Sequence, residues 1–187
     1  MKKALGFLLI ILLDTAIAQD PKVCSDWPAW MQPACRRLNQ IWTEGSNELY
    51  LSGYAWHNRF IYPKTRIRKY NEQAWGGGLG KGLYDERGNW HGLFAIAFLD
   101  SHKNIEPAAG YAFLKVVHLS TQANFGVGYA VLVTARPDIF HGRPFPGAVP
   151  WVSLNINKVS IAATYIPGNS RSGNVLYVAG KLRFDFF

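Results

Sequence analysis

Bulky hydrophobic residues alternate with small or polar ones in eight segments of this chain, which is the pattern of β-strands whose two faces meet different surroundings. Pro and Gly separate these segments at the spacing of an all-β protein. The predicted strands cover residues 49–57, 75–84, 90–99, 108–117, 125–134, 151–158, 160–166 and 175–186.

The distribution of bulk on the two strand faces distinguishes a membrane barrel from a soluble one. In the fifth predicted strand Phe125, Val127 and Tyr129 share one face, and Gly126 and Gly128 take the other. Large residues facing outward and small residues facing inward are typical of a lipid-facing barrel, whereas a lipocalin-like barrel places its apolar face inside. The sequence therefore predicts an all-β fold, an eight-stranded antiparallel transmembrane β-barrel.

Two further segments precede the predicted barrel. Lysines stand before an apolar run that is too short to span a bilayer, and a small-residue cleavage pattern follows, so residues 1–18 are predicted to be a secretory signal peptide. Residues 30–44 place their apolar side chains on one helical face, so the segment 19–46 is predicted to hold a periplasmic amphipathic α-helix. Residues 47–187 then form the barrel.

Composition and charge narrow the class of partner. The chain is 49% hydrophobic and 17% charged, which excludes intrinsic disorder, and its net charge is +8. A basic exported protein can attract anionic headgroups or lipopolysaccharide phosphates, and export argues against nucleic acid as a partner. Cys24 and Cys35 are predicted to form a local disulfide, because a metal site would need further ligands. We expect no metal and no cofactor.

The predicted lumen is polar at one end and apolar elsewhere. A packed hydrophobic plug and a pocket for one acyl chain both fit the apolar lining, since eight strands leave room for side chains or for one small ligand. The polar end is predicted to hold Asn155, Asn157, Lys181, Arg183 and Asp185. The apolar part is predicted to hold Leu93, Ala95, Ala97, Leu99, Gly128, Ala130 and Leu132.

Three residues at predicted strand ends could carry chemistry. If both termini lie in the periplasm, the first and third strands present His57, Asp100 and Ser101 at the outer rim. A histidine can act as a general base, a carboxylate can fix its tautomer, and a hydroxyl can join the relay or bind an oxyanion. A regular strand points Asp100 and Ser101 to opposite faces, so both reach one site only where the strand has ended. A hydrogen-bonded surface loop explains the same residues.

Eight ordered motifs bring these segments together. They are Trp56-His57-Asn58-Arg59-Phe60, Tyr70-Asn71-Glu72 with Trp75-Gly76-Gly77-Gly78, Tyr84-Asp85 with Asn89-Trp90-His91-Gly92-Leu93, Asp100-Ser101, Glu106-Pro107 with Ala109-Gly110-Tyr111, Thr134-Ala135-Arg136, Thr164-Tyr165-Ile166-Pro167-Gly168 and Gly173-Asn174-Val175. In this order they closely resemble the PagP family of lipid A palmitoyltransferases. The resemblance covers nearly the whole chain after the signal peptide.

The resemblance implies a Gram-negative outer-membrane acyltransferase that moves a palmitoyl chain from the sn-1 position of a phospholipid to lipid A of lipopolysaccharide, and so supports resistance to cationic antimicrobial peptides. The family's catalytic residues map onto His57, Asp100 and Ser101. We expect His57 to be the general base and Asp100 to orient it or stabilise its charge. Two roles of Ser101 are open: it could act as a nucleophile or as a positioning hydroxyl. The family uses neither metal nor nucleotide, and we expect a monomer.

Further residues are expected to contact the substrates. Arg136 and the basic rim residues Lys64, Arg66, Arg68 and Lys69 could hold lipid A phosphates. A gap between the sixth and seventh strands is expected at two prolines, because proline lacks the N–H that a ladder needs. The residues expected to meet the lipids are Arg136, Trp90, Ala95, Ala97, Ala112, Gly128, Pro150 and Pro167.

Two departures from the family pattern concern these substrates. Ser52 and Ala74 stand where the family usually has prolines that loosen the barrel wall, so the sequence leaves open the route by which one lipid enters. Ala112 stands at the pocket floor, where palmitate-selective members have glycine. Its added methyl group predicts a donor preference at or slightly below sixteen carbons.

Two other functions remain as alternatives. A non-catalytic small outer-membrane barrel would need neither His57 nor Asp100. A lipid A esterase would release free fatty acid and form no acylated lipid A.

Overall fold

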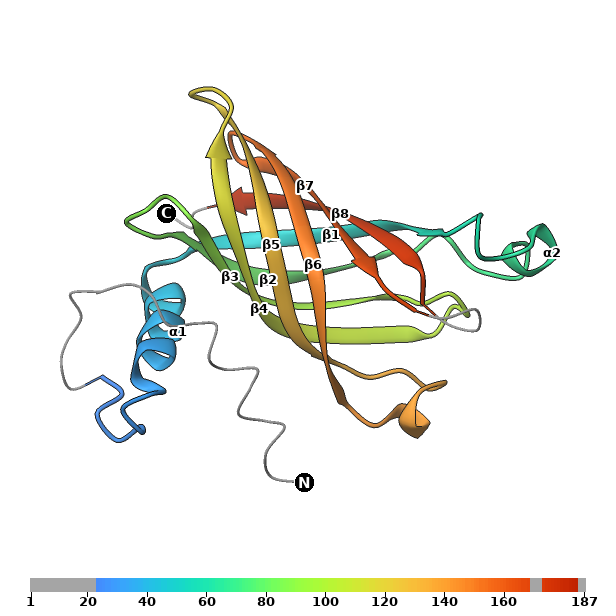
Figure 1. Ribbon diagram of the computed structural model, residues 1–187, viewed down its shortest axis with the longest axis horizontal. Helices are drawn as coiled ribbons and strands as arrows, with labels where there is room; N and C mark the ends of the chain where they lie inside the picture. The colour runs from blue at the N-terminus through green and yellow to red at the C-terminus, as the bar shows by residue number, and fades with distance from the viewer. Residues whose placement is uncertain (1–22, 169–172, 185–187) are drawn as a thin grey trace. The chain divides into compact units, whose positions relative to one another are not determined.

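Eight antiparallel strands form a closed barrel in which each strand pairs with its neighbours in sequence and β8 pairs with β1 (Figure 1). The computed structural model describes residues 23–168 and 173–184, so the predicted signal peptide lies outside the described residues. The predicted eight-stranded antiparallel barrel is confirmed. The strands are β1 Ser46–His57, β2 Gly76–Tyr84, β3 Trp90–Leu99, β4 Ile105–His118, β5 Ala123–Thr134, β6 Phe145–Ile156, β7 Val159–Ile166 and β8 Val175–Phe184.

The segment ahead of the barrel holds one helix, α1 (Gln32–Glu44), with a proline in its first turn, where the missing N–H costs no helical hydrogen bond. A disulfide joins Cys24 to Cys35 and ties the preceding chain to the start of this helix, as predicted. The periplasmic location of the segment stays a prediction. Among the described residues, no helix is both long enough and apolar enough to cross a membrane.

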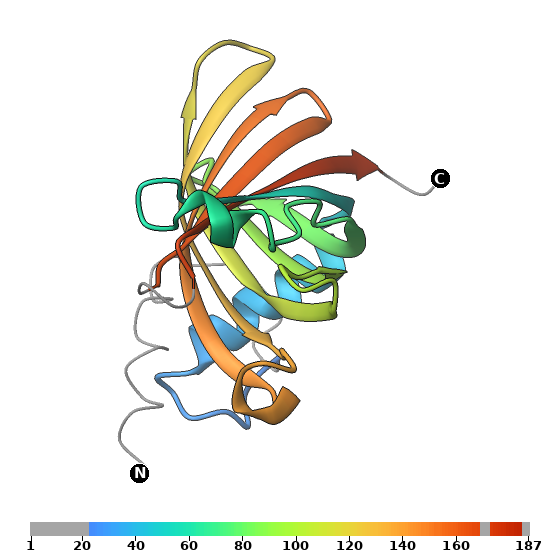
Figure 2. The ribbon, with the colours of Figure 1, turned by 90° about the vertical axis from the view of Figure 1, so that its right-hand side faces the viewer.

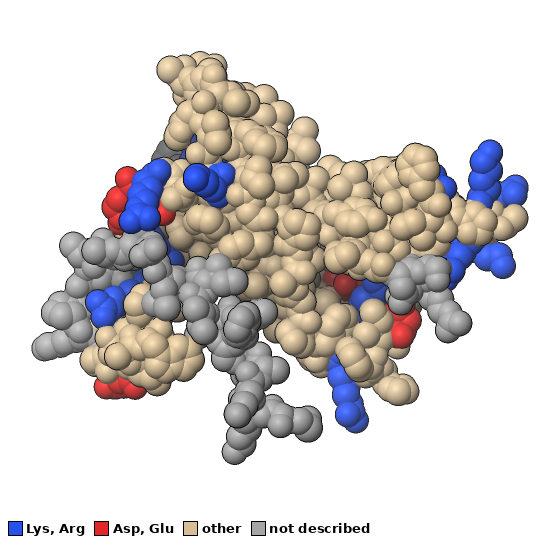
Figure 3. Space-filling model, in the orientation of Figure 1, with Lys and Arg blue, Asp and Glu red and all other residues tan. Residues whose placement is uncertain are grey.

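The outer face of the barrel is apolar. Leu51, Leu79, Val127 and Ile161 are all exposed there. Figure 3 shows a broad uncharged surface, with basic side chains at the end that carries the short helix α2 (Lys64–Ile67) and others at the opposite end. Figure 2 views the barrel from that end. The closed ladder satisfies the backbone groups of the strands, so this outer face suits contact with lipid hydrocarbon.

A bulge at Gly53 changes which side chains of β1 face the lumen. The β1–β8 register shifts between Ser52 and Tyr54, so Gly53 is an extra residue. Even-numbered residues face the lumen before the shift, and Ala55 and His57 face it afterwards. In a regular strand of the same residues, with Gly53 paired and no bulge, the alternation would turn His57 to the outer face. The bulge therefore places His57 inside the barrel.

The prediction of which β3 residues face the lumen was wrong. Ala95 and Ala97 are exposed on the outer face, and Leu93 and Leu99 share that alternation. On the neighbouring strand β2 the lumen face is glycine, and a Cβ at Gly78 would come within 2.6 Å of an Ile96 methyl group. Because glycines line the lumen side of β2, the large side chains of β3 fit inside the barrel. The size of the β3 residues alone therefore does not show which face of this strand is the inner one. The lumen-facing residues of β3 are Phe94, Ile96 and Phe98.

β6 begins at Phe145, earlier than predicted. Pro146 and Pro150 lie in the first part of β6, which pairs with β5 alone, and the β6–β7 ladder starts at Trp151 opposite Thr164. A proline removes no ladder hydrogen bond on a side that has no partner.

The end of the lumen away from α2 is polar. Lys181 Nζ lies 2.7 Å from Glu48 Oε1 and 3.8 Å from the centre of the Trp90 ring, and the Tyr50 hydroxyl donates to Glu48 Oε2 at 2.8 Å. The buried charges are thus paired and hydrogen-bonded, as a low-dielectric interior requires.

Of the other residues predicted at this polar end, Asn155 is buried and donates to Ser153 Oγ at 3.0 Å. Asn157 was wrongly placed: it is exposed in the β6–β7 turn with φ 54°, a left-handed conformation that asparagine tolerates. Asp185 lies outside the described residues.

Candidate active site

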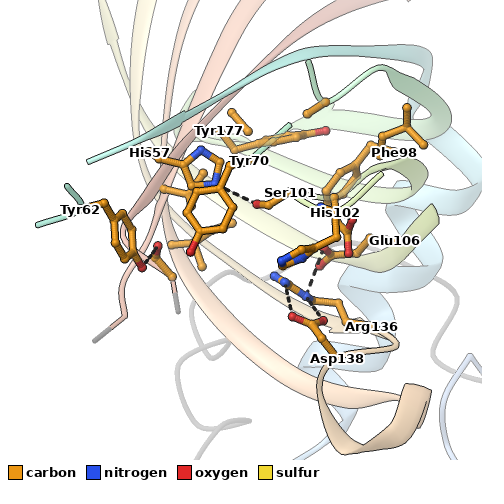
Figure 4. Close-up of a pocket in the computed structure, with 17 residues that line it drawn as sticks. His57, Tyr62, Tyr70, Phe98, Ser101, His102, Glu106, Arg136, Asp138 and Tyr177 are labelled. Carbon is orange, nitrogen blue, oxygen red and sulfur yellow. Dashed lines mark hydrogen bonds and ion pairs between the residues drawn. The ribbon is translucent and has the colours of Figure 1, made fainter. Parts of the chain in front are cut away.

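The end of the barrel that carries α2 contains a cavity of about 80 Å³. Its walls include parts of residues 58–75 between β1 and β2 and of residues 100–104 between β3 and β4, together with Arg136, Asp138 and Gly173 from two further loops. Figure 4 shows His57 facing Ser101 here, with Tyr70 over the histidine ring. The lining also includes the ring pair of Phe98 and Tyr177, whose centroids are 4.7 Å apart.

The structure brings His57 and Ser101 together. His57 is the last residue of β1 and is 2% exposed, and its Nε2 lies 2.8 Å from Ser101 Oγ. β3 ends at Leu99, so the alternation of side chains along a strand does not apply to Ser101, which lines the cavity. A base and a hydroxyl in this contact can share or transfer a proton.

Asp100 lines the same cavity, but its carboxylate holds its own loop. Oδ1 accepts the backbone N–H groups of His102 and Asn104, both at 2.8 Å, and Oδ2 accepts the Asn104 amide at 3.3 Å. These bonds close the turn that presents Ser101. We expected Asp100 to orient His57 or to stabilise its charge. The carboxylate oxygen beside His57 Nδ1 belongs to another residue, and a charge-stabilising role of Asp100 stays a prediction.

That residue is Glu72, whose Oε1 lies 3.2 Å from His57 Nδ1. Glu72 also forms a two-pronged ion pair with Arg59, at 2.5 and 2.6 Å. Hydrogen bonds from Arg59 lower the pKa of Glu72 to about 2. Tyr70-Asn71-Glu72 was among the motifs behind the family resemblance, but no spacing in the sequence assigned Glu72 to His57.

Two tyrosines of the 58–75 loop enclose the histidine ring. Tyr70 stacks on His57 with centroids 4.5 Å apart and planes at 23°, and Tyr62 meets it edge-on at 6.4 Å. Arg66 lies over both tyrosine rings and donates from Nε to the Tyr70 hydroxyl at 2.7 Å. Loop 58–75 therefore supplies most of the contacts that hold His57.

Arg136 belongs to a separate network on the cavity wall (Figure 4). Its guanidinium forms an ion pair with Asp138 at 2.8 Å and lies 3.7 Å from Glu106. Although burial lowers the pKa of Arg136, its hydrogen bonds to Asp138 and the nearby carboxylates outweigh that effect and raise it. A phosphate at this position would compete with two carboxylates for the same cation.

Trp90 and Ala112 lie in the packed middle of the lumen. Both are buried, and they belong to one cluster with Phe94 and Ala130. Gly128 also faces the lumen, where a Cβ would overlap the Phe113 carbonyl. The cavity above this cluster is smaller than the roughly 300–1,000 Å³ usual for ligand pockets. Ala95 and Ala97 face outward and line no part of the lumen.

The barrel wall has two interrupted ladders near the site. β6 residues before Trp151 have no β7 partner, and Pro150 and Pro167 lie beside this gap, where the Thr164 hydroxyl donates to the Pro150 carbonyl at 2.6 Å. The β1–β2 ladder stops at Ser52 opposite Gly76, even though the usual prolines are missing.

The β1–β2 interruption is bridged by a side chain. The Ser52 hydroxyl donates to the Ala74 carbonyl, and Ala55 and Ala74 next to it line the cavity. At this point the wall has no regular backbone ladder; besides the serine hydrogen bond, the Ala55 backbone N–H donates to the Glu72 carbonyl at 2.9 Å.

Within residues 23–168 and 173–184, no three His, Cys, Asp or Glu side chains are grouped to hold a metal ion.

The family profile described as "Antimicrobial peptide resistance and lipid A acylation protein PagP" matches residues 37–181. The chain belongs to the PagP family. The motifs that contain His57 and Ser101 meet at the cavity.

Named relatives agree with this membership. A "Lipid A acyltransferase PagP" of Legionella longbeachae is 62% identical over 169 residues, which is 89% of this chain and 73% of that protein. A protein of the same name from Legionella pneumophila is 52% identical over 185 residues, 97% of this chain and 99% of that protein. Among solved structures, the outer membrane protein Ail of Yersinia pestis covers 75% of this chain and 100% of that chain, with 12% identity and a TM-score of 0.41.

Proposed function

We propose that this member of the PagP family is an outer-membrane acyltransferase that moves a palmitoyl or slightly shorter chain from the sn-1 position of a glycerophospholipid to lipid A. The observation that carries the proposal is the 2.8 Å contact between His57 Nε2 and Ser101 Oγ at the cavity, in a chain whose relatives are named lipid A acyltransferases. The apolar outer face of the barrel supports a place in the outer membrane, where we propose that the protein acts as a monomer.

The proposed reaction exchanges one ester for another. The acyl carbon loses its bond to the glycerol oxygen and gains a bond to a hydroxyl oxygen of lipid A. The lipid A hydroxyl loses a proton and the glycerol oxygen gains one, so a base that accepts and returns a proton suits the reaction. His57 Nε2 is that base in our proposal.

Ser101 has two roles compatible with its contact to His57. As a positioning hydroxyl it holds the ring until the lipid A hydroxyl replaces it. As a nucleophile it gives its proton to Nε2 and carries the acyl group on Oγ before the group passes to lipid A. Asp100 serves both roles by closing the turn that presents Ser101.

We propose that the packed apolar lumen opens to take up a long acyl chain. The lining below His57 includes the aromatic pair Phe98 and Tyr177, and the packed cluster around Ala112 lies farther down the barrel. We propose that an incoming chain displaces these side chains and that Ala112 limits its length. Each methylene buried along the way contributes about 0.8 kcal/mol, so chain length affects binding strongly.

The basic side chains near the cavity suit anionic lipid headgroups. Lys64, Arg66, Arg68 and Lys69 lie on or beside α2, at the end where Figure 3 shows positive charge. We propose that this segment attracts lipid A phosphates, and that Arg136, which already holds Asp138 and Glu106, shapes the cavity wall.

Mass spectrometry of lipid A tests this function. Cells that express the wild-type chain should gain lipid A with the mass of one added palmitoyl or slightly shorter chain, and cells with equal amounts of inserted His57→Ala protein should not. Free fatty acid without acylated lipid A would instead support an esterase. No lipid change from a correctly inserted wild-type barrel would support a non-catalytic protein.

A further inference from the structure

Glu72 holds His57 at two points. Its Oε1 accepts the backbone N–H of His57 at 3.0 Å and lies 3.2 Å from Nδ1 of the ring. Contacts to the main chain and to the ring of one residue fix both where the histidine lies and how its ring is turned. Glu72 comes from the far end of loop 58–75 and is 21% exposed, so the folded loop is what brings the two together.

Arg59 keeps this carboxylate ionised and in place. Its two terminal nitrogens donate to the two oxygens of Glu72, and Nη1 also donates to the His57 carbonyl oxygen at 2.7 Å. With a pKa lowered to about 2, Glu72 is negatively charged at neutral pH. An ionised carboxylate accepts hydrogen bonds and cannot donate them. The ring nitrogen that faces it, Nδ1, must therefore carry the hydrogen.

In neutral His57, Nε2 then has the lone pair. This nitrogen faces Ser101 Oγ at 2.8 Å, so the hydroxyl donates to it. Tyr70 stacks on the ring and opposes its rotation, and Tyr70 is itself held by Arg66. The basic nitrogen is thus directed into the cavity before any substrate binds.

We propose that Glu72, clamped by Arg59, is a positioning residue for acyl transfer: it fixes the Nδ1–H tautomer of His57 and so aims Nε2 at the reacting hydroxyl. The role of Glu72 in catalysis rests on the proposed function, whereas its effect on the tautomer of His57 does not. In this assignment Glu72 takes the orienting role that the resemblance gave to Asp100, and Asp100 acts on the turn of Ser101. Glu72 acts through His57 and touches no substrate.

The tautomer can be measured directly on the full-length barrel in detergent micelles. Long-range ¹H–¹⁵N spectra of protein labelled with ¹⁵N-histidine distinguish the two neutral forms, and a His57→Gln spectrum identifies the His57 signals. We expect a protonated Nδ1 in wild type and loss of this preference in Glu72→Gln. Asp85→Asn is the matched control, because Asp85 contacts a different histidine, His91, at 3.1 Å.

Activity provides the second measurement. With a diacyl phosphatidylcholine donor and purified lipid A as acceptor, we expect kcat of Glu72→Gln to fall at least about tenfold, since general-base catalysis is worth roughly 10²–10⁴-fold. KM for both lipids should stay within about twofold, because Glu72 is not among the residues that line the cavity. Glu72→Asp keeps the charge and should recover part of kcat. Asp85→Asn should match wild type.

The outcomes separate the two proposals. A folded Glu72→Gln barrel with a protonated Nδ1 and wild-type kcat would overturn the role of Glu72. A rise in KM alone would assign Glu72 to substrate binding and also overturn it. If wild-type protein transfers no acyl group, the proposed function fails, and the spectrum alone then decides whether Glu72 sets the tautomer. For each variant, a difference in gel mobility between heated and unheated samples checks that the barrel has folded.

Discussion

Two histidines at opposite ends of the barrel have nearly the same partners. His57 ends β1 beside the loop that carries α2, and His91 lies near the start of β3 beside the turn at 85–89. In each case one ring nitrogen meets a carboxylate and the other meets a hydroxyl. The distances are 3.2 Å to Glu72 and 2.8 Å to Ser101 for His57, and 3.1 Å to Asp85 and 2.7 Å to Tyr111 for His91.

The difference lies in the surroundings of the two rings. His57 faces the lumen and lines a cavity, and its partners come from two loops that lie far from it in sequence. His91 is paired with Leu83 and Phe113 on the outer face of the sheet, and its carboxylate partner comes from the turn that precedes its own strand. The same three chemical groups can therefore form a reactive site or a structural one, and access to a cavity distinguishes them.

Removal of each imidazole should give the largest contrast. We expect His57→Ala to lower lipid A acylation roughly 10²–10⁴-fold, since it removes the general base. His91→Ala should lower it by less than about threefold at equal amounts of inserted barrel, since this ring lies on the outer face and does not line the cavity that contains His57. Lipid A mass spectra of the two strains compare them directly. Equal losses of lipid A acylation in the two strains would show that access to the cavity does not distinguish His57 from His91.

Removal of each hydroxyl should give a smaller contrast. Loss of a hydroxyl that stabilises a transition state costs roughly 10²–10³-fold in rate, and loss of a merely positioning hydroxyl costs less. We expect Ser101→Ala to reduce kcat at least about tenfold, and Tyr111→Phe to leave it within about twofold. A covalent acyl group on Ser101, trapped by acid quench and seen by peptide mass spectrometry, would identify the nucleophile.

The sequence predicted the strands well, because alternating hydrophobicity and Pro or Gly breaks are local signals. It did not predict the inner face of β3, since both faces of that strand are apolar and the choice depends on glycines such as Gly78 in β2. It found His57 and Ser101 but could not show that the Gly53 bulge turns His57 inward. Glu72 was missed because its contact with His57 depends on how a long loop folds.

The inner and outer faces of the barrel allow a third contrast. Ala112 is fully buried in the lumen, and Ala97 faces outward. Ala112→Leu should shorten the preferred donor chain, because each methylene that no longer fits forfeits about 0.8 kcal/mol, or about fourfold in affinity. Ala97→Leu should leave the preference unchanged. The masses of acylated lipid A measure both, and a wild-type barrel that accepts all chain lengths equally would contradict a length limit at Ala112.

Acidification should give the smallest effect. Hydrogen bonds from Arg59 lower the pKa of Glu72 from 4.5 to about 2. A carboxyl group with a lowered pKa stabilises the folded state while it is ionised, so this contribution is complete above its ordinary pKa and is lost as the pH falls from about 4.5 to about 2. Because Arg59 is 37% exposed, solvent weakens the pair and the loss should be small.

The change should appear in the loop that Glu72 joins to His57. In wild type, amide hydrogen exchange in residues 58–75, corrected for its intrinsic pH dependence, should accelerate a few-fold across this window. In Glu72→Gln it should be fast already at pH 6 and change little on acidification. Asp85→Asn should affect the 85–89 turn and leave loop 58–75 as in wild type. If loop 58–75 kept its protection down to pH 2 in wild type, the ion pair would not be what orders the site around His57.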